Sequence, residues 1–238
     1  MDLLFLLQLF LSLLWRGSSS EKDPESWINV QEMVTLQEGL CVSIPCSFHY
    51  SQQHKNNNTA HGYWFQRTEQ DKLVATSDTQ QDVQSWAQGR FHLIGDPQMG
   101  NCSLSITGVQ KQDHGDYWFQ VEKGDLRYNY TSKMLSVHVE ELTQKPEVCI
   151  PPILEAGHEV TLTCIAPGDY REVTPINFLW TGSALFSQGF VWQDLNSSQI
   201  LFIPKAQGHG TNLTCQVTLP EAGVTTETTV QLRLACEC

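Results

Sequence analysis

Basic residues are scarce in this chain of 238 residues. Lys and Arg total 14 against 26 Asp and Glu, so the formal net charge at pH 7 is −12. Nucleic acid and anionic membrane surfaces attract cationic patches, so we expect neither as a partner. The hydrophobic share of 40%, with 10% aromatic residues, argues against a disordered chain.

Long apolar runs are also rare, and only residues 1–15 form one. This run is too short for a membrane anchor, which is the competing interpretation. Small residues suited to cleavage follow at 16–20, so we predict a secretory signal peptide over residues 1–20, although the usual positive N-terminal region is missing. No transmembrane segment follows. We therefore expect the chain to be secreted as written, or to be the extracellular part of a longer, plasma-membrane form.

Catalytic and metal-binding patterns are missing from the sequence as well. The histidines are scattered, and no His-Asp-Ser set or paired carboxylates stand out, so we expect no enzyme and no cofactor. Cys236 and Cys238 lie near acidic residues, but zinc knuckles use Cys-x2-Cys pairs. An intermolecular disulfide, or no role at all, fits this tail better than a metal.

Cysteines and glycosylation sequons, in contrast, are plentiful. The chain has eight cysteines, which is typical of proteins that mature in an oxidising compartment. Asn-x-Ser/Thr sequons agree with that compartment. They begin at Asn57, Asn101, Asn129, Asn196 and Asn212.

Short strand-like runs separated by turn residues fill the chain from residue 27 onward, which is an all-β pattern. Cys46 and Trp64 have the spacing of the strand B cysteine and the buried strand C tryptophan of an immunoglobulin sandwich. Asp113-x-Gly115-x-Tyr117 is typical of the corner that leads into strand F, where the tyrosine hydroxyl bonds back to the backbone. Arg90 and Asp113 are expected to form an ion pair at the base of this domain.

A second, shorter sandwich is predicted after a polar linker. Cys164, Trp180 and Cys215 have the spacing of a constant-type domain with the ordinary inter-sheet disulfide. The predicted fold is therefore all-β, with two tandem immunoglobulin-like sandwiches, variable-type and then constant-type. The expected division is a signal peptide at 1–20, a V-type domain at 21–140, a linker at 141–148, a C2-type domain at 149–235 and a tail at 236–238.

The first sandwich lacks one feature of antibody domains, a cysteine on strand F. Phe119 stands at that place, so the available partner for Cys46 is Cys102 on strand E. Strands B and E are neighbours in one sheet. We therefore predict an intra-sheet disulfide Cys46–Cys102 in the first domain and an inter-sheet disulfide Cys164–Cys215 in the second.

The cysteine pattern and several short phrases together point to one family. Cys41-x4-Cys46, Cys102 without a strand F cysteine, and the phrases at 37–41, 89–91, 95–97, 101–104 and 209–217 resemble the Siglecs, the sialic-acid-binding immunoglobulin-like lectins. The similarity is greatest to their myeloid subgroup and covers about residues 27–234.

The resemblance implies a lectin site on the face formed by strands C, F and G. In the family, an arginine on strand F clamps the sialic acid carboxylate with its planar fork. That position here is Gln120, which has neither the charge nor the fork. Strand G offers Arg127, Tyr128 and Asn129, and Trp27 on strand A maps more loosely to the aromatic that packs on the N-acetyl group.

Each of these residues has a second interpretation. Gln120 is either a site residue with altered specificity or an ordinary exposed strand residue that remains after loss of function. Arg127 either grasps a carboxylate in compensation or is simply solvated. Tyr128 and Trp118 are more typical of packing residues than of ligand platforms, and a glycan on Asn129 would stand over the site.

Cys41 also departs from the family pattern. In the family, the cysteine at the position of Cys41 forms a disulfide with the second domain. Its partner there is a cysteine that lies shortly after the position of Cys164. No cysteine stands in that loop here, and Cys149 lies near the domain junction. We predict a substitute bridge Cys41–Cys149, with Cys236 or Cys238 as competing partners.

Two functions follow from these expectations. The first is a Siglec-like recognition and adhesion module of immune cells, with sialic acid binding weakened or lost. Its partners would be sialylated glycans or glycoproteins, or a protein ligand on another cell. The alternative is a non-signalling decoy or structural adhesion fragment that binds a protein ligand.

Overall fold

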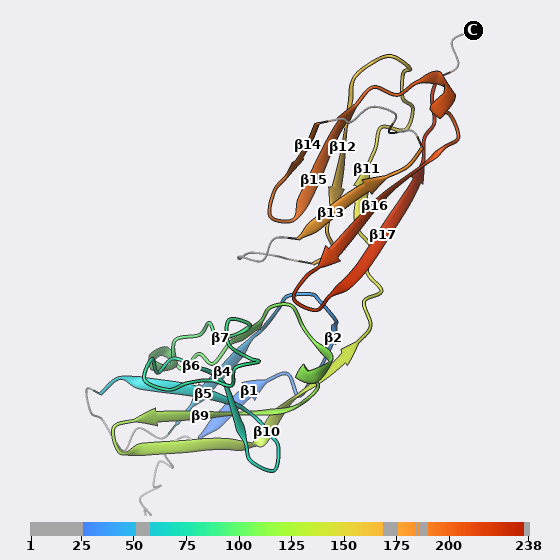
Figure 1. The fold of residues 1–238 in the computed structure, drawn as a ribbon. Coiled ribbons are helices and arrows are strands. Elements are labelled where there is room, and N and C mark those ends of the chain that lie inside the picture. The colour runs from blue at the N-terminus through green and yellow to red at the C-terminus, as the bar shows by residue number, and fades with distance from the viewer. Residues whose placement is uncertain (1–25, 51–57, 169–175, 184, 186–189, 236–238) are drawn as a thin grey trace, which may run out of the picture.

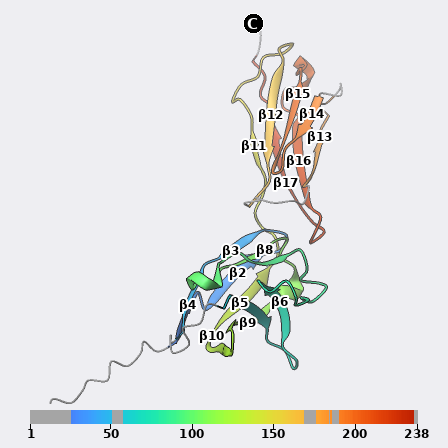
Figure 2. The same cartoon turned by 90° about the vertical axis from the view of Figure 1, so that its left-hand side faces the viewer.

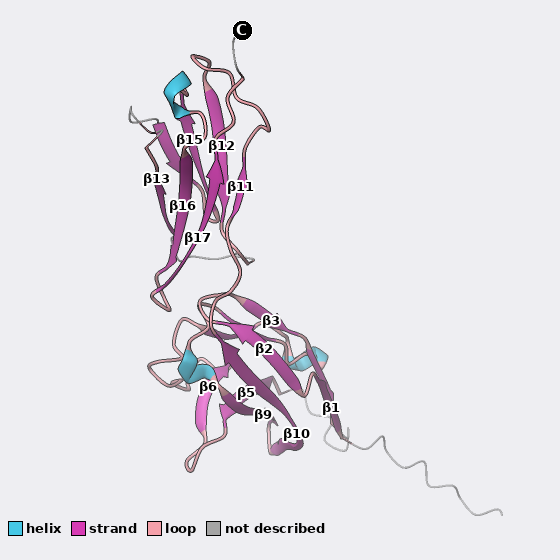
Figure 3. Cartoon of the chain, turned by 90° about the vertical axis from the view of Figure 1, so that its right-hand side faces the viewer, coloured by secondary structure: helices cyan, strands magenta, loops and turns pink. Residues whose placement is uncertain are grey.

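The computed structural model describes residues 26–50, 58–168, 176–183, 185 and 190–235. The predicted signal peptide, Asn57 and the cysteines at 236–238 lie outside these residues. The described part is built from strands, with only three short 3₁₀ turns (Figure 3). They are η1 (Pro97–Met99), η2 (Lys111–Asp113) and η3 (Ala206–Gly208). Within the described ranges no helix is long and apolar enough to span a membrane. The all-β prediction is confirmed.

Two sandwiches lie end to end and are joined by one connection after β10 (Figure 1). In the first, a five-stranded sheet has the order β2-β10-β9-β5-β6, and the strands β1-β4 and β3-β8-β7 form the opposite layer (Figure 2). This order is that of a variable-type immunoglobulin domain. The bounds are β1 (Trp27–Val30), β2 (Met33–Gln37), β3 (Val42–Ile44), β4 (Cys46–His49), β5 (Ala60–Gln66), β6 (Lys72–Thr76), β7 (Phe91–Leu93), β8 (Leu104–Ile106), β9 (Gly115–Lys123) and β10 (Leu126–Glu140).

The core of the first sandwich is aromatic and fully enclosed. Trp64, Tyr117 and Phe119 are each 0% exposed. The Trp64 indole donates to the carbonyl of Cys102 at 2.8 Å, so its polar N–H is satisfied inside the core. Phe119 packs on Trp64 and fills the space that a strand F cysteine would occupy in an antibody domain.

The predicted corner and ion pair are both confirmed. The Tyr117 hydroxyl donates to the carbonyl of Asp113 at 2.7 Å. Arg90 makes two parallel hydrogen bonds to the Asp113 carboxylate, at 2.8 and 2.9 Å, and Asp113 is 0% exposed. A buried carboxylate is tolerated here because the guanidinium fork neutralises it and the backbone N–H of Gln110 donates to it at 2.8 Å.

β9 and β10 form the hairpin that carries the candidate site. The turn between them is Gly124-Asp125, and Gly124 has φ +60°, which glycine adopts without strain. β10 shifts register between Tyr130 and Leu135 and then runs parallel to β2. Beyond the shift, Ser136 and Val137 pair with β9 on one edge of β10 and with β2 on the other.

The second sandwich packs the sheet β11-β12-β15-β14 on the sheet β13-β16-β17. This is the four-plus-three arrangement of constant-type domains. Its core includes Trp180, Leu162 and Leu213, and Leu213 stands where a corner tyrosine is often found. The bounds are β11 (Glu147–Cys149), β12 (Val160–Ile165), β13 (Asn177–Thr181), β14 (Phe190–Gln193), β15 (Ser197–Phe202), β16 (Asn212–Leu219) and β17 (Val224–Gln231). β11 starts inside the linker expected at 141–148.

The junction between the sandwiches is closely packed. Leu40 of the first sandwich is buried in the core cluster of the second. Gly39 approaches so closely that an added Cβ would lie 2.7 Å from Leu219. The Gln110 side chain donates to the carbonyl of Glu221 at 2.8 Å. The two ends are therefore held by direct contacts as well as by the chain connection.

Candidate functional site

The outer face of β5, β9 and β10 carries three of the residues that the sequence singled out, Gln120, Arg127 and Asn129. In the strand register, Gln120 lies opposite Tyr63 on one side and Asn129 on the other. The next outward-facing row contains Glu122 and Arg127. Side chains alternate along a strand, so these two rows share a face while Phe119 and Val121 point into the core.

Gln120 is buried in this face, with an exposure of 2%. Its side-chain nitrogen donates to Glu122 Oε1 at 2.7 Å. The interpretation as an ordinary exposed strand residue is therefore wrong. The family's arginine position is occupied here by a neutral amide whose donor is directed at a carboxylate of the same strand.

Arg127 carries the positive charge next to this position. Its Nε lies 3.1 Å from Glu122 Oε1, and its side chain is 66% exposed. An exposed pair of this kind contributes little to stability. It nevertheless means that the Glu122 oxygen that accepts from Gln120 is also ion-paired with Arg127, so the guanidinium already faces an anion.

Tyr63 completes the row on the β5 side. Its hydroxyl donates to Asp78 Oδ2 at 3.1 Å, and the residue is 6% exposed. Burial raises the Tyr63 pKa above its ordinary value, and the nearby charges of Glu122 and Asp78 raise it further. Tyr63 therefore stays neutral at physiological pH and cannot act as an anion toward a ligand.

Trp118 shares the face of β9 that carries Gln120, whereas Tyr128 lies opposite Val121 and therefore projects from the other side of the sheet. Trp118 is 7% exposed and stacks on Phe65 with ring centroids 4.6 Å apart. Its indole donates to Asp71 Oδ2 at 3.1 Å, so it acts as a packing residue. Tyr128 is 36% exposed and leans against Tyr130, with ring centroids 4.7 Å apart.

Trp27 sits on β1, in the opposite layer. It is 48% exposed, and its ring stacks on His49 at 6.1 Å. The carbonyl of His49 accepts a hydrogen bond from the Tyr130 hydroxyl at 2.7 Å, which ties β4 to β10. Trp27 is thus connected to the G strand through His49, but it belongs to a different sheet from Gln120.

Asn129 is exposed directly opposite Gln120. A glycan on its side chain would rise from the row that contains the family's arginine position. The sequon residue Thr131 is also exposed, at the start of the bulge in β10.

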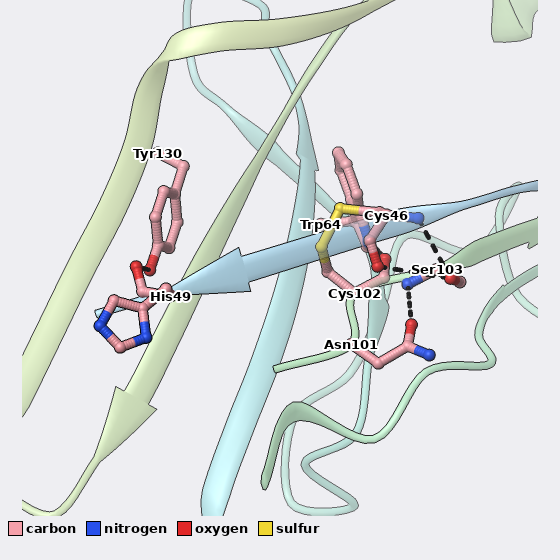
Figure 4. Close-up of a disulfide and its surroundings, with 7 residues drawn as sticks. All are labelled: Cys46, His49, Trp64, Asn101, Cys102, Ser103 and Tyr130. Carbon is pink, nitrogen blue, oxygen red and sulfur yellow. Dashed lines mark hydrogen bonds between the residues drawn. A yellow bond between two sulfur atoms is a disulfide. The ribbon is translucent and has the colours of Figure 1, made fainter. Parts of the chain in front are cut away.

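The disulfides follow the sequence prediction in both sandwiches. Cys46 is bonded to Cys102, and Cys164 to Cys215 (Figure 4 shows the first). The predicted Cys41–Cys149 bridge is wrong. The Cys149 thiol is exposed and forms no disulfide. Cys41 instead borders a small hollow at the junction with Ile176, Leu219 and Glu221, whereas β11 places Cys149 beside Thr163 of β12.

Glu122, Tyr63 and Asp78 were not among the residues proposed from sequence. Glu122 could have been found, because it lies two residues after Gln120 on one strand and so shares its face. The positions of Tyr63 and Asp78 in the site depend on how β5 and β6 align with β9, which no local sequence pattern gives.

Among the described residues, no group of three or more His, Cys, Asp or Glu side chains is arranged to hold a metal ion.

The fold defines a class of protein, one with two tandem immunoglobulin-type domains. The family description "Immunoglobulin V-set domain" matches residues 29–140. Human "Sialic acid-binding Ig-like lectin 8" is 44% identical over 96% of this chain and 48% of its own length. Human "Sialic acid-binding Ig-like lectin 10" is 44% identical over 97% of the chain and 34% of its own length. The chimpanzee (Pan troglodytes) "Sialic acid-binding Ig-like lectin 12" is 46% identical over 87% and 35%.

The chain belongs to the Siglec family, the sialic acid-binding immunoglobulin-like lectins. It spans about half or less of the length of these relatives.

Proposed function

We propose that this chain is a Siglec-type recognition and adhesion module of the extracellular side of immune cells, and that its sialic acid binding is weakened or lost. The observation that carries the proposal is Gln120. It occupies the position of the family's clamping arginine, is buried, and donates to Glu122. A ligand carboxylate arriving there would meet another carboxylate in place of a guanidinium fork.

The free energies of the contacts involved support the proposed loss of affinity for sialic acid. A bidentate contact between arginine and a carboxylate is among the strongest hydrogen-bonded pairs in proteins, and removing it costs on the order of 2–3 kcal/mol or more. Binding of a single sugar at millimolar affinity corresponds to only about −4 kcal/mol. Arg127 does not replace the lost cation, because its charge is already directed at Glu122.

An extracellular location is part of the proposal. The sequon asparagines that the structure describes, Asn101, Asn129, Asn196 and Asn212, are all exposed, as glycan acceptors must be in the mature protein. Both sandwiches carry disulfides, which persist in oxidising compartments.

The test is binding of a dimeric Fc fusion of residues 21–235 to sialylated cells, before and after sialidase treatment. We expect weak binding, or binding that sialidase does not change. Sialidase-insensitive binding would identify a protein ligand, as in the decoy or adhesion alternative. Strong binding that sialidase abolishes would contradict the proposal and show that another cation receives the carboxylate.

A further inference from the structure

The sequon Asn101-Cys102-Ser103 has a disulfide cysteine as its middle residue. In the folded domain Cys102 is 0% exposed and bonded to Cys46, while Asn101 is exposed one residue earlier (Figure 4). The acceptor asparagine and the bridge therefore share three consecutive residues, and each is subject to a covalent reaction in the same compartment.

The Ser103 hydroxyl is occupied in the folded state. It accepts from the backbone N–H of Cys46 at 3.1 Å and donates to the carbonyl of the same residue at 3.4 Å. A sequon requires a hydroxyl two residues after the asparagine. This hydroxyl is read by the transferring enzyme, and here the strand that carries Cys46 covers it.

The backbone of the sequon is fixed just as firmly. The three N–H groups of residues 101–103 donate to the carbonyl of Asp96 at 3.1 Å, the carbonyl of Cys46 at 3.0 Å and the side chain of Asn101 at 2.9 Å. The carbonyl of Cys102 accepts from the buried indole of Trp64 at 2.8 Å. Gly95 lies so close beneath that an added Cβ would be 2.6 Å from the carbonyl of Asn101.

We propose that Asn101 accepts an N-linked glycan only while the Cys46–Cys102 bond is open, so that glycosylation and disulfide closure compete for the same segment. The glycan is transferred when Asn101 Nδ2 attacks the anomeric carbon of a lipid-linked oligosaccharide. The new C–N bond replaces the C–O bond to the lipid pyrophosphate, which leaves, and the amide nitrogen loses one proton. Closure of the bond instead transfers two electrons and two protons from the thiols to a disulfide oxidant of the secretory pathway.

Glycosylation must precede disulfide closure because of the hydrogen bonds that hold Ser103. Exposure of Asn101 alone would not impose this order. Once the bridge closes, β4 and the segment before β8 are held together, and Ser103 can no longer be presented to an enzyme. Chains that close the bridge early therefore leave Asn101 bare permanently. The mature protein is expected as two populations that differ by one glycan on the face formed by β4, β8 and β7.

The experiment uses the chain made in the bacterial periplasm, where disulfides form without this glycosylation. The wild type, Cys46→Ala and Cys164→Ala are each incubated, without reductant, with oligosaccharyltransferase and its lipid-linked donor. Non-reducing peptide mapping verifies that the Cys46–Cys102 bond is present in the wild type and in Cys164→Ala. The readout is the mass of the peptide that contains Asn101.

We expect Cys46→Ala to gain the glycan at Asn101, because without the disulfide the segment 101–103 can separate from β4 and present the Ser103 hydroxyl to the enzyme. The wild type and Cys164→Ala should show no mass shift at this peptide. Cys164→Ala is the matched control, since it also loses one disulfide but leaves the first bridge intact. A mass shift at Asn101 of equal extent in all three proteins would overturn the proposal, as would no shift in Cys46→Ala.

Discussion

Gln120 and Glu122 lie two positions apart on β9, and their side chains are joined by a hydrogen bond. Gln120 places a neutral amide at the position of the family's arginine, and Glu122 is also ion-paired with Arg127. The proposed loss of affinity for an anionic ligand therefore involves both residues.

We expect Gln120→Arg to restore sialoside binding only in part. The substitution returns the charge and the fork, but the new guanidinium lies within reach of Glu122, and a glycan on Asn129 still stands opposite it. Gln120→Arg with Thr131→Ala, which removes the sequon, should bind better than either single variant, because neighbouring groups at one site are not additive. Sialidase-sensitive binding of Fc fusions measures this. Equal binding by Gln120→Arg with and without Thr131→Ala would show that the glycan does not shield the site.

Asp113 offers a stability test at the same scale. Its carboxylate is 0% exposed and is neutralised by Arg90. Asp113→Ala should lower the free energy of unfolding by about 3–5 kcal/mol, because it leaves a buried guanidinium unpaired. Arg90→Leu with Asp113→Ala should cost less than Asp113→Ala alone, since no charge is then stranded. Chemical denaturation of the three variants decides, and a double variant less stable than Asp113→Ala would contradict this account.

Among the strands, the amino-acid sequence predicts the turn and the aromatic strand of the β9–β10 hairpin but not the burial of Gln120. The glycine turn and the aromatic strand were predictable, because turn chemistry and strand alternation are local. The burial of Gln120 was not, because it depends on Tyr63 of β5 and on the alignment of three strands. The Cys41–Cys149 bridge failed for a related reason. Position near a junction in sequence does not show which side of a strand a thiol occupies.

Two phenylalanines of the β14–β15 hairpin test how much burial of a side chain contributes to stability. Phe190 on β14 is 80% exposed, whereas Phe202 on β15 is 4% exposed. Phe202→Ala should destabilise the second sandwich by about 3–5 kcal/mol through the lost transfer energy and the cavity. Phe190→Ala removes the same atoms from a strand at the sheet edge and should change the free energy of unfolding by less than about 0.5 kcal/mol. Thermal denaturation of the pair measures both, and similar losses would mean that Phe190 is covered in solution.

The whole molecule depends on a junction in which glycines permit close contact. An added Cβ at Gly108, where φ is +53°, would lie 2.5 Å from Glu221 Cβ. Gly89 has a comparable φ of +74°, yet a Cβ there would meet nothing within 4 Å. Comparing substitutions at the two glycines therefore distinguishes the strain of a positive φ, which both share, from the steric crowding at the junction, which only Gly108 has.

Gly108→Ala should accordingly loosen the arrangement of the two sandwiches, while Gly89→Ala should not. Both substitutions carry a backbone penalty, because alanine is strained at positive φ. Only Gly108→Ala also pushes Glu221 away and weakens the contact that Gln110 makes with its carbonyl. Small-angle X-ray scattering should show a broader distribution of molecular dimensions for Gly108→Ala. Identical scattering by the two variants would mean that the junction is held by other contacts.

The two disulfides also set how far the chain can be stretched when its two ends are pulled apart. Each bond closes a covalent loop, with sequence separations of 56 and 51 residues. A fully extended chain spans at most about 3.3–3.6 Å per residue. The residues inside the two disulfide loops therefore cannot contribute roughly 190 Å and roughly 180 Å to the extended length while the bonds are intact. A sandwich that ruptures under load would therefore lengthen by only part of its chain, and the tether would stay short. In a single-molecule pulling experiment, a reductant should release these lengths as additional steps.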